Sequence, residues 1–258
     1  MAIIKSFRIK TFKKKINKIS LKNISLSFNK LNVLEDVSFD IHQSSITGLL
    51  GPNGSGKSTL FNIICGILSP NYGDVIINGI NVNKIPVFER VQKYGISLIP
   101  QTGGTFSGLS CIENLKAISE IVIEKKNERN YKIEEMISKF QLEPHAHTKC
   151  CELSGGSKKK VAIAMALMSS PAILLMDEPF AFLDILTVRD LQETIVNLQT
   201  EDSSRCIIIS DHSARELLGI SDRALVLANK KIVAQGSPRE VIDSPSARIY
   251  FGDSFKIN

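Results

Sequence analysis

Short apolar runs alternate with amphipathic segments over much of the chain, and this alternation predicts an α/β fold. The runs ITGLL (46–50), AILLM (172–176) and CIIIS (206–210) are mainly apolar. Runs of this length and type are typical of strands buried in a parallel sheet. Between the last two lies ILTVRDLQETIVNLQ (185–199), which has the apolar spacing of an amphipathic helix. The pattern therefore predicts a parallel sheet covered by helices.

Other segments have a different character. Residues 21–100 read as strands and turns, with a turn at Gly79 in DVIINGI, and RALVLANKKIVAQG (223–236) reads as two short strands around a turn. From residue 102 to 152 the pattern becomes helical, with amphipathic segments CIENLKAISEIVIE and RNYKIEEMISKF. No repeat is found, so we expect one domain with a helical insertion.

Composition fits a globular chain with an unusual N-terminus. Of 258 residues, 43% are hydrophobic and 22% charged, and no run approaches the ~18 apolar residues of a membrane span. The start has no apolar stretch long enough for a signal peptide, so we expect a cytoplasmic protein. Nine Lys and Arg and no acid within residues 1–30 account for the formal net charge of +6. We interpret residues 1–18 as a basic, solvated extension; contact with anionic lipid or nucleic acid stays open.

The five cysteines show no paired spacing and read as reduced thiols. Cys150 and Cys151 follow His145 and His147, which superficially resembles a metal cluster. The spacing matches no zinc motif, and adjacent cysteines bind one ion awkwardly. We therefore interpret this stretch as a surface loop.

The stretch GPNGSGKST fits the pattern G-x-x-x-x-G-K-[ST] at every fixed position. It follows a predicted strand and precedes KSTLFNIICGIL, whose apolar positions have helical spacing through Leu68, and this is the context of a phosphate-binding loop. We expect Lys57 to reach the β- and γ-phosphates and Ser58 to ligate Mg²⁺. The predicted nucleotide-binding residues are Gly51, Pro52, Asn53, Gly54, Ser55, Gly56, Lys57, Ser58 and Thr59.

Two acids end the strand in AILLMDEP. Asp177 lies at its carboxyl end, where α/β sheets bind ligands, and is expected to hold Mg²⁺. Glu178 follows and could polarise a water in line with the γ-phosphate, although a surface acid at a turn is the simpler alternative. A hydrolase and a nucleotide kinase would both carry these two motifs.

The stretch LSGGSKKK (153–160) admits two interpretations, a flexible basic loop or a helix N-terminus that binds an anion. The following VAIAMALMSS is helical in pattern, which favours the second. Three lysines in the first turn conflict with the helix dipole, and an approaching triphosphate would relieve the conflict.

Taken in order with IPQ (99–101), AFLD (181–184) and SDH (210–212), these motifs resemble the ATP-binding subunits of ABC transporters from about residue 20 to the end. The resemblance implies a P-loop NTPase core with an inserted helical subdomain (about 102–160) and an antiparallel β subdomain, within a nucleotide-binding domain of residues 19–258. It implies ATP hydrolysis coupled to transport by a head-to-tail homodimer with ATP and Mg²⁺. Integral membrane subunits would dock near residues 101–109, at the cytoplasmic face of the inner membrane, and no nucleic acid is expected.

The resemblance also implies roles for single residues. Phe28 would stack on adenine, Gln101 would contact Mg²⁺ and the attacking water, and His212 would contact the γ-phosphate. Ser154, Gly155 and Gly156 would face ATP held by the other copy, and Asp184 would link the two sites. A lone histidine is more often structural, but the ordered motifs outweigh that default.

Three positions depart from the family pattern: Ser157 replaces Gln or Glu, Met165 replaces Arg and Ile185 replaces Pro. Ser157 removes a reciprocal helix cap, which weakens the helix start. None of the three removes a phosphate or metal ligand, so they bear on the rate of the reaction and not on its type.

The C-terminal part resembles one branch of the family, the ATPases that power lipopolysaccharide export. Tyr250, Gly252, Phe255 and Lys256 fit its tail, and Phe106 fits an aromatic of its docking groove, where Ser107 departs from an expected arginine. The alternatives are the ATPase of a branched-chain amino acid importer and a soluble ABC ATPase. The latter would usually carry two such domains or a long coiled coil, and neither is found in this sequence. The contacts to the cargo would lie in partner chains, so the sequence does not identify the cargo.

Overall fold

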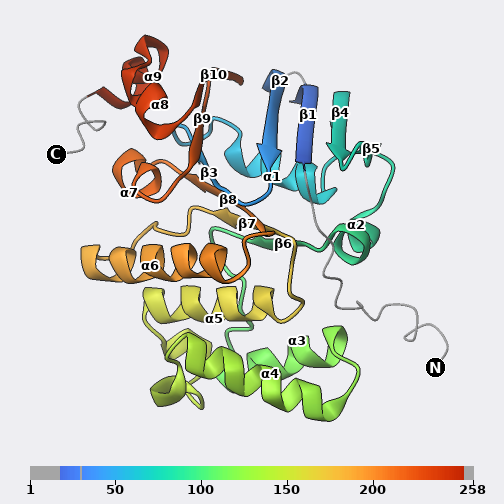
Figure 1. The fold of residues 1–258 in the computed structure, drawn as a ribbon, viewed down its shortest axis with the longest axis vertical. Coiled ribbons are helices and arrows are strands. Elements are labelled where there is room, and N and C mark those ends of the chain that lie inside the picture. The colour runs from blue at the N-terminus through green and yellow to red at the C-terminus, as the bar shows by residue number, and fades with distance from the viewer. Residues whose placement is uncertain (1–17, 30, 253–258) are drawn as a thin grey trace.

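The computed structural model describes residues 18–29 and 31–252, which form two β-sheets with helices packed around them (Figure 1). Most of the predicted basic extension lies outside the described residues, as do Phe255 and Lys256 of the tail pattern. Lys18 belongs to the fold, because it is the first residue of β1 (Lys18–Phe28) and pairs with His42.

The larger sheet has the strand order β10-β9-β3-β8-β7-β6. Its strands are β3 (Ile46–Leu50), β6 (Ile96–Ile99), β7 (Ile173–Asp177), β8 (Cys206–Asp211), β9 (Arg223–Ala228) and β10 (Lys231–Gly236). All neighbours pair in parallel except β10 and β9. Every residue of β3, β7 and β8 is buried, which explains their continuous apolar runs. The predicted α/β fold is confirmed.

The smaller sheet is antiparallel and has the order β2-β1-β4-β5, with β2 (Leu31–His42), β4 (Tyr72–Ile77) and β5 (Ile80–Asn81). The turn between β4 and β5 consists of Asn78 and Gly79, both at positive φ, as the sequence predicted for Gly79. An apolar core that includes Leu49 and Phe61 fills the space between the two sheets.

The helix after the phosphate loop, α1 (Lys57–Cys65), is shorter than its apolar pattern. Gly66 adopts a left-handed conformation with φ 85°, and its N–H donates to the carbonyls of Asn62 and Ile63. This glycine ends the helix before Leu68, although the apolar spacing continues.

Helix α2 (Val87–Tyr94), which packs beside the carboxyl-terminal end of α1, is absent from the sequence-based prediction of strands and turns. Val87, Val91 and Tyr94 have helical spacing, but the segment has only eight residues, and its buried residues are Arg90 and Tyr94. The Arg90 guanidinium donates to the carbonyls of Ile63 and Ile64 at the end of α1, at 2.8 and 2.9 Å. A buried arginine thus takes the place of an apolar anchor and complements the negative end of α1.

The remaining helices cover the larger sheet and extend away from it. They are α3 (Cys111–Val122), α4 (Lys126–Lys139), α5 (Gly155–Leu167), α6 (Ile185–Glu201), α7 (Ala214–Leu218), α8 (Pro238–Asp243) and α9 (Pro245–Phe251), with 3₁₀ turns η2 (Glu143–His145) and η3 (Cys150–Glu152). In Figure 1, α6 and α5 lie against the larger sheet, and α3 and α4 lie furthest from the smaller one. Within the described part of the chain, no helix has the length and apolar character of a membrane span.

The interpretation of residues 145–151 as a surface loop is wrong for Cys150. This thiol is 1% exposed and accepts a hydrogen bond from Asn114 Nδ2 at 3.3 Å, whereas Cys151 is exposed. The same Asn114 amide holds the carbonyls of Phe106, Leu109 and Ser110. Cys150 is therefore part of the core of the helical group and no member of an exposed loop.

Candidate functional site

The phosphate loop joins β3 to α1, and its glycines are required by geometry. A Cβ on Gly51 would lie 2.3 Å from the Leu227 carbonyl oxygen, and Gly56 has φ 106°. Gly56 is also the N-cap of α1 and has no side chain to accept a hydrogen bond. The first N–H groups of that helix are therefore available to a ligand. The Ser55 hydroxyl is buried and has no hydrogen-bond partner among the described residues. The loop therefore presents donors and a positive helix end to an anion.

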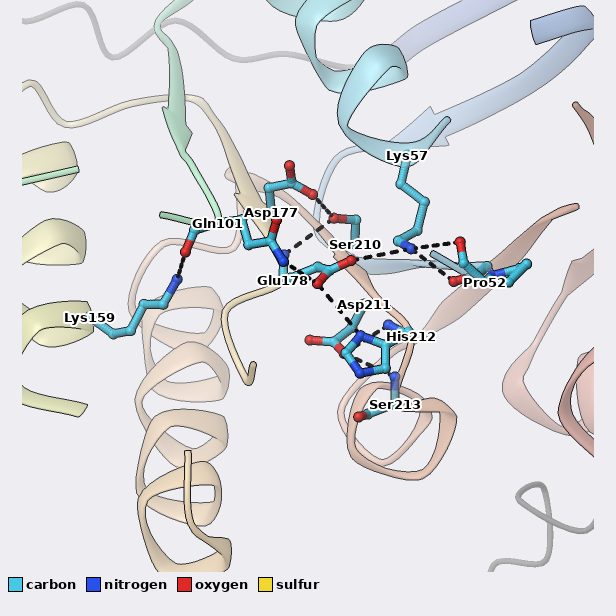
Figure 2. Close-up of polar contacts among 11 residues, drawn as sticks. Pro52, Lys57, Gln101, Lys159, Asp177, Glu178, Ser210, Asp211, His212 and Ser213 are labelled. Atoms are coloured by element: carbon cyan, nitrogen blue, oxygen red, sulfur yellow. Dashed lines mark hydrogen bonds and ion pairs between the residues drawn. The ribbon is translucent and has the colours of Figure 1, made fainter. Parts of the chain in front are cut away.

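Lys57 points its ammonium into this loop (Figure 2). The side chain is 4% exposed, and Nζ donates to the carbonyls of Gly51 at 2.8 Å and Pro52 at 3.3 Å. Its third partner is Glu178 Oε1 at 3.3 Å, which supplies the opposite charge that a buried ammonium needs.

Glu178 lies directly after β7, and its carboxylate is contacted by Lys57, Gln101 and His212 (Figure 2). Gln101 Nε2 donates to Oε2 at 2.6 Å, and His212 Nδ1 lies 3.6 Å from the same oxygen. The backbone of Glu178 is left-handed with φ 45°, and its N–H donates to the Ser210 carbonyl at 2.8 Å. Such a conformation costs about 1–3 kcal/mol in a residue with a side chain and persists only where surrounding contacts impose it.

Two further polar residues, Ser210 and Asp211, support this cluster. The motifs predicted no role for either of them. The Ser210 hydroxyl donates to Asp177 Oδ1, and Asp211 Oδ1 accepts the N–H groups of His212 and Ser213 at 2.8 and 2.9 Å. Asp211 is fully buried, and burial raises the pKa of its carboxyl. The available signal was that Ser210 ends the apolar run CIIIS and Asp211 follows it directly.

Three predicted Mg²⁺ ligands offer oxygen atoms of suitable type. Ser58 lies exposed in the first turn of α1, and Asp177 is 7% exposed at the end of β7. Gln101 uses its amide nitrogen on Glu178, which leaves the amide oxygen as its acceptor atom. Hydroxyl, carboxylate and amide oxygens are the donors that hard divalent cations prefer, so the residues fit Mg²⁺.

Ser154, Gly155 and Gly156, here called the signature residues and forming the signature loop, stand at the start of helix α5. Ser154 is the N-cap, and its hydroxyl accepts the N–H of Ser157 at 3.2 Å and donates to the Ser157 hydroxyl at 3.0 Å. Ser157 therefore retains a short hydroxyl contact to the cap where a Glu would have reached back to the cap backbone.

The chain itself supplies acceptors for the lysines that conflict with the dipole of α5. Lys158 donates to the Cys151 carbonyl, Lys159 donates to the Gln101 carbonyl at 2.7 Å, and Lys160 pairs with Asp190 at 2.7 Å. Burial lowers the pKa of Lys159. The expectation that an incoming triphosphate relieves this conflict is thus unnecessary.

The signature glycines pack against the loop that carries Asp184. A Cβ on Gly156 would lie 2.4 Å from Thr187 Cγ2, and one on Gly155 would lie 3.3 Å from Leu183. Asp184 caps α6 by accepting the N–H groups of Leu186 and Thr187, both at 3.0 Å. Hydrogen bonds from the Thr187 hydroxyl and backbone hold the pKa of Asp184 below its usual value.

The structure thus brings the predicted residues together in two groups. Lys57, Gln101, Asp177, Glu178 and His212 form one group, and Phe28 lies half-exposed at the end of β1. The signature residues and Asp184 form the other. Within the described ranges, no hydrogen bond or ion pair joins Ser154, Gly155 or Gly156 to residues 51–59.

Comparisons with known proteins bear on what this arrangement does. Residues 34–181 match the family model described as ABC transporter. The lipopolysaccharide export system ATP-binding protein LptB of Acidithiobacillus ferridurans is 36% identical over 90% of this chain and 95% of its own length. The protein of the same name from Escherichia coli (strain K12) is 34% identical over 93% of this chain and 99% of its own.

One similar solved structure contains the products of ATP hydrolysis. The dimeric, post-hydrolysis ATP-binding cassette bound to ADP and Pi has a TM-score of 0.76 and 26% identity, and covers 86% of this chain and 99% of its own. The family model spans more than half of the chain, and the phosphate loop, Asp177, Glu178 and His212 lie together as the motifs predicted. The chain belongs to the ABC transporter family, as one of its ATP-hydrolysing subunits.

Proposed function

We propose that this chain is the motor subunit of a transporter that extracts lipopolysaccharide from the inner membrane for export. Two copies would act at the cytoplasmic face of that membrane with integral membrane partners. The Glu178 carboxylate contacts Lys57, Gln101 and His212, and this arrangement supports the part of the proposal that concerns ATP hydrolysis. The cargo rests on the similarity to the LptB proteins. Tyr250 of the tail accepts a hydrogen bond from Asn229 at 2.7 Å, which ties the aromatic tail to the β9–β10 turn.

In this proposal each side chain has one task in hydrolysis. Lys57 binds the β- and γ-phosphates, Glu178 takes a proton from the water that attacks the γ-phosphate, and Gln101 and His212 orient that water. Mg²⁺ held by Ser58, Asp177 and Gln101 would neutralise phosphate charge. The polar contacts around Glu178 fit this role, because they fix a carboxylate beside the phosphate loop.

The second group of residues would complete the site of another copy. Ser154 and the N–H groups of Gly155 and Gly156 start helix α5, an arrangement suited to an anion. Within the part of the chain that the structure describes, no hydrogen bond or ion pair joins them to the phosphate loop, so a second copy is the natural source of the ATP they would meet. The dimeric ATP-binding cassette with ADP and Pi supports this arrangement. Phe28 would stack on the adenine.

A groove of about 280 Å³ offers a docking site for the membrane partner. Its lining is mainly apolar and includes Val91, Leu98, Ile118, Val122 and Met165.

Pro100, which precedes Gln101, and Gly104, three residues after it, also line the groove. A partner bound there would therefore shift the segment whose Gln101 side chain donates to Glu178. At position 165 methionine replaces the arginine common in the family, which makes the groove apolar. An apolar helix face of a partner fits such a surface.

Reconstitution with the membrane subunits that co-purify with this chain tests the cargo. We expect ATP hydrolysis to rise in proteoliposomes that contain lipopolysaccharide, and to stay unchanged on addition of branched-chain amino acids with their binding protein. Stimulation by the amino acids alone would favour the importer. Stimulation by nucleic acid without membrane partners would favour a soluble ABC ATPase.

The groove is tested by placing a charge in it. Val91→Glu should reduce recovery of the membrane subunits by about tenfold or more, because a buried unpaired carboxylate opposes an apolar contact. Val196→Glu is the matched control, since Val196 is 39% exposed on α6 and outside the groove. ATP binding should stay normal in both variants. Equal recovery with Val91→Glu and wild type would place the partner elsewhere.

A further inference from the structure

One buried hydroxyl lies between the two acids at the end of β7 (Figure 2). Ser210 pairs with Asp177 in the ladder between β7 and β8, and its hydroxyl donates to Asp177 Oδ1. The same hydroxyl oxygen accepts the N–H of Glu178 at 3.4 Å. Ser210 therefore contacts both acids that the motifs assigned to the reaction.

The fold does not require a hydroxyl at this position. Ser210 is fully buried, and Ile208, which lies two residues earlier on the same face of β8, is 1% exposed. An apolar side chain would fill such a position without the cost of removing a hydroxyl from water. The hydroxyl offsets that cost with its two hydrogen bonds, and both are made to the acids. Its contribution is therefore specific to Asp177 and Glu178.

The hydrogen bond to Ser210 sets the orientation of the Asp177 carboxylate. Among the residues that the structure describes, this carboxylate has no other hydrogen bond or ion pair. Because Oδ1 is turned to Ser210, Oδ2 is the oxygen that remains for a cation. A carboxylate that ligates a metal is commonly held by an outer hydrogen bond of this kind, and losing it costs about 10- to 100-fold in metal affinity or activity.

Glu178 depends less on the hydroxyl. Its N–H also donates to the Ser210 carbonyl at 2.8 Å, and this shorter bond uses only the backbone. Its carboxylate is held by Lys57 and Gln101. Alanine in place of Ser210 would keep all of these contacts except the longer bond, so loss of the hydroxyl should disturb Asp177 first.

We propose that Ser210 is a positioning residue for ATP hydrolysis. Its hydroxyl holds the Asp177 carboxylate in the orientation that receives Mg²⁺ and fixes that carboxylate relative to Glu178. The inference rests on the proposed function, which assigns Asp177 to Mg²⁺ and Glu178 to the attacking water.

Binding of Mn²⁺ to the full chain tests this role without hydrolysis. In a Glu178→Gln background with a non-hydrolysable ATP analogue, Ser210→Ala should raise the Mn²⁺ dissociation constant by about tenfold or more, as measured by electron paramagnetic resonance. Ser210→Thr keeps the hydroxyl and should restore the constant. Ser119→Ala is the matched control, because the Ser119 hydroxyl is also buried but donates to the Lys116 carbonyl in α3, and the constant should not change.

Hydrolysis gives a second measurement in the chain that retains Glu178. At a Mg²⁺ concentration that just saturates the wild type, Ser210→Ala should hydrolyse ATP about 10- to 100-fold more slowly, and more Mg²⁺ should restore part of the rate. A chain that is only less stable would not respond to Mg²⁺ in this way. If Ser210→Ala unfolds below the assay temperature, Ser210→Cys gives the same comparison with a weaker donor.

The outcomes separate this role from the proposed function. Equal Mn²⁺ constants with and without Ser210→Ala overturn the positioning role while the proposed function stands. A weaker Mn²⁺ site that Ser119→Ala shares would assign the effect to packing and also overturns the role. Normal ATP hydrolysis by Glu178→Gln alone would overturn the proposed mechanism, whereas the Mn²⁺ comparison would still decide whether Ser210 orients Asp177.

Discussion

The phosphate loop and the signature loop both precede a helix, yet they differ in which side chains surround them. At the first, Lys57 is 4% exposed and paired with Glu178, and Gln101 and His212 come from separate strands to the same carboxylate. At the second, Ser154 caps its own helix, and the two glycines pack on the Asp184 loop. One terminus is surrounded by reactive side chains of its own chain, and the other is an outer surface.

The difference has an energetic origin. A buried ammonium and carboxylate need each other, so the residues around Lys57 and Glu178 must be supplied within the fold. The signature loop is exposed, and water can satisfy its free N–H groups until a ligand arrives. A surface of this kind can be left for another copy to complete, which is the basis of the dimer in the proposed function.

The largest expected effect is on the first region. Glu178→Gln should lower steady-state ATP hydrolysis by about 10²- to 10⁴-fold, because it removes the proposed proton acceptor and retains the shape. Nucleotide binding should persist, and the ATP-bound dimer should accumulate in gel filtration. Glu143→Gln, an exposed acid at η2, is the control and should hydrolyse ATP normally. Normal turnover in Glu178→Gln would remove the general-base assignment.

The second region should be equally necessary for hydrolysis but dispensable for binding. In Ser154→Arg the bulky cation would block the face that meets the other copy, and hydrolysis should fall by about 10²-fold or more. Equilibrium binding of ATP to the monomer should not change, since the hydrogen bonds of the Ser154 hydroxyl go to Ser157 and not to residues 51–59.

Mixing two inactive variants tests the contrast directly. A dimer of one Ser154→Arg chain and one Lys57→Ala chain contains one intact composite site, so the mixture should regain measurable hydrolysis. The same variants mixed with themselves should stay inactive. Failure of the mixture, with both chains folded and associated, would mean that the signature loop serves its own chain.

A smaller effect concerns the packing of the signature glycines. Gly156→Ala should lower the free energy of unfolding by about 1–3 kcal/mol, because its Cβ would lie 2.4 Å from Thr187 Cγ2. Thr187→Ser removes that methyl and keeps the hydroxyl, so the double variant should recover most of the loss in urea denaturation. Gly155→Ala meets Leu183 at 3.3 Å and should cost less. Additive effects in the double variant would contradict the proposed clash.

The smallest effect compares a thiol at the far end of α1 with one just before the signature loop. Burial raises the pKa of Cys65, at the end of α1, to about 12, whereas Cys151, just before the signature loop, is exposed. Below pH 9 a thiol reagent should modify Cys151 alone in the native protein, because buried thiols are protonated and shielded. All five should react in denaturant, and mass spectrometry of digested protein identifies the site. Rapid native labelling of Cys65 would indicate that α1 opens.

Much of the site was predictable because its residues are fixed by local sequence. The phosphate loop and the ends of β7 and β8 each depend on a strand followed by a turn, which apolar runs reveal. Helix α2 was missed because its apolar positions span only eight residues, too few to distinguish a helix from a strand by pattern. The buried Arg90 gives no apolar signal, and Cys150 was misplaced because its burial depends on Asn114 and distant carbonyls.

The sequence by itself determined the α/β class, the phosphate loop, the acidic strand end and the order of motifs that marks the family. Only the tertiary structure decided how these meet: that Glu178 receives Lys57, Gln101 and His212, that Lys159 reaches the Gln101 carbonyl, and that a Cβ on Gly156 would clash with Thr187. Apolar periodicity encodes which face of a strand or helix is buried. Contacts between polar groups far apart in the chain arise only when the sheet brings their strands side by side.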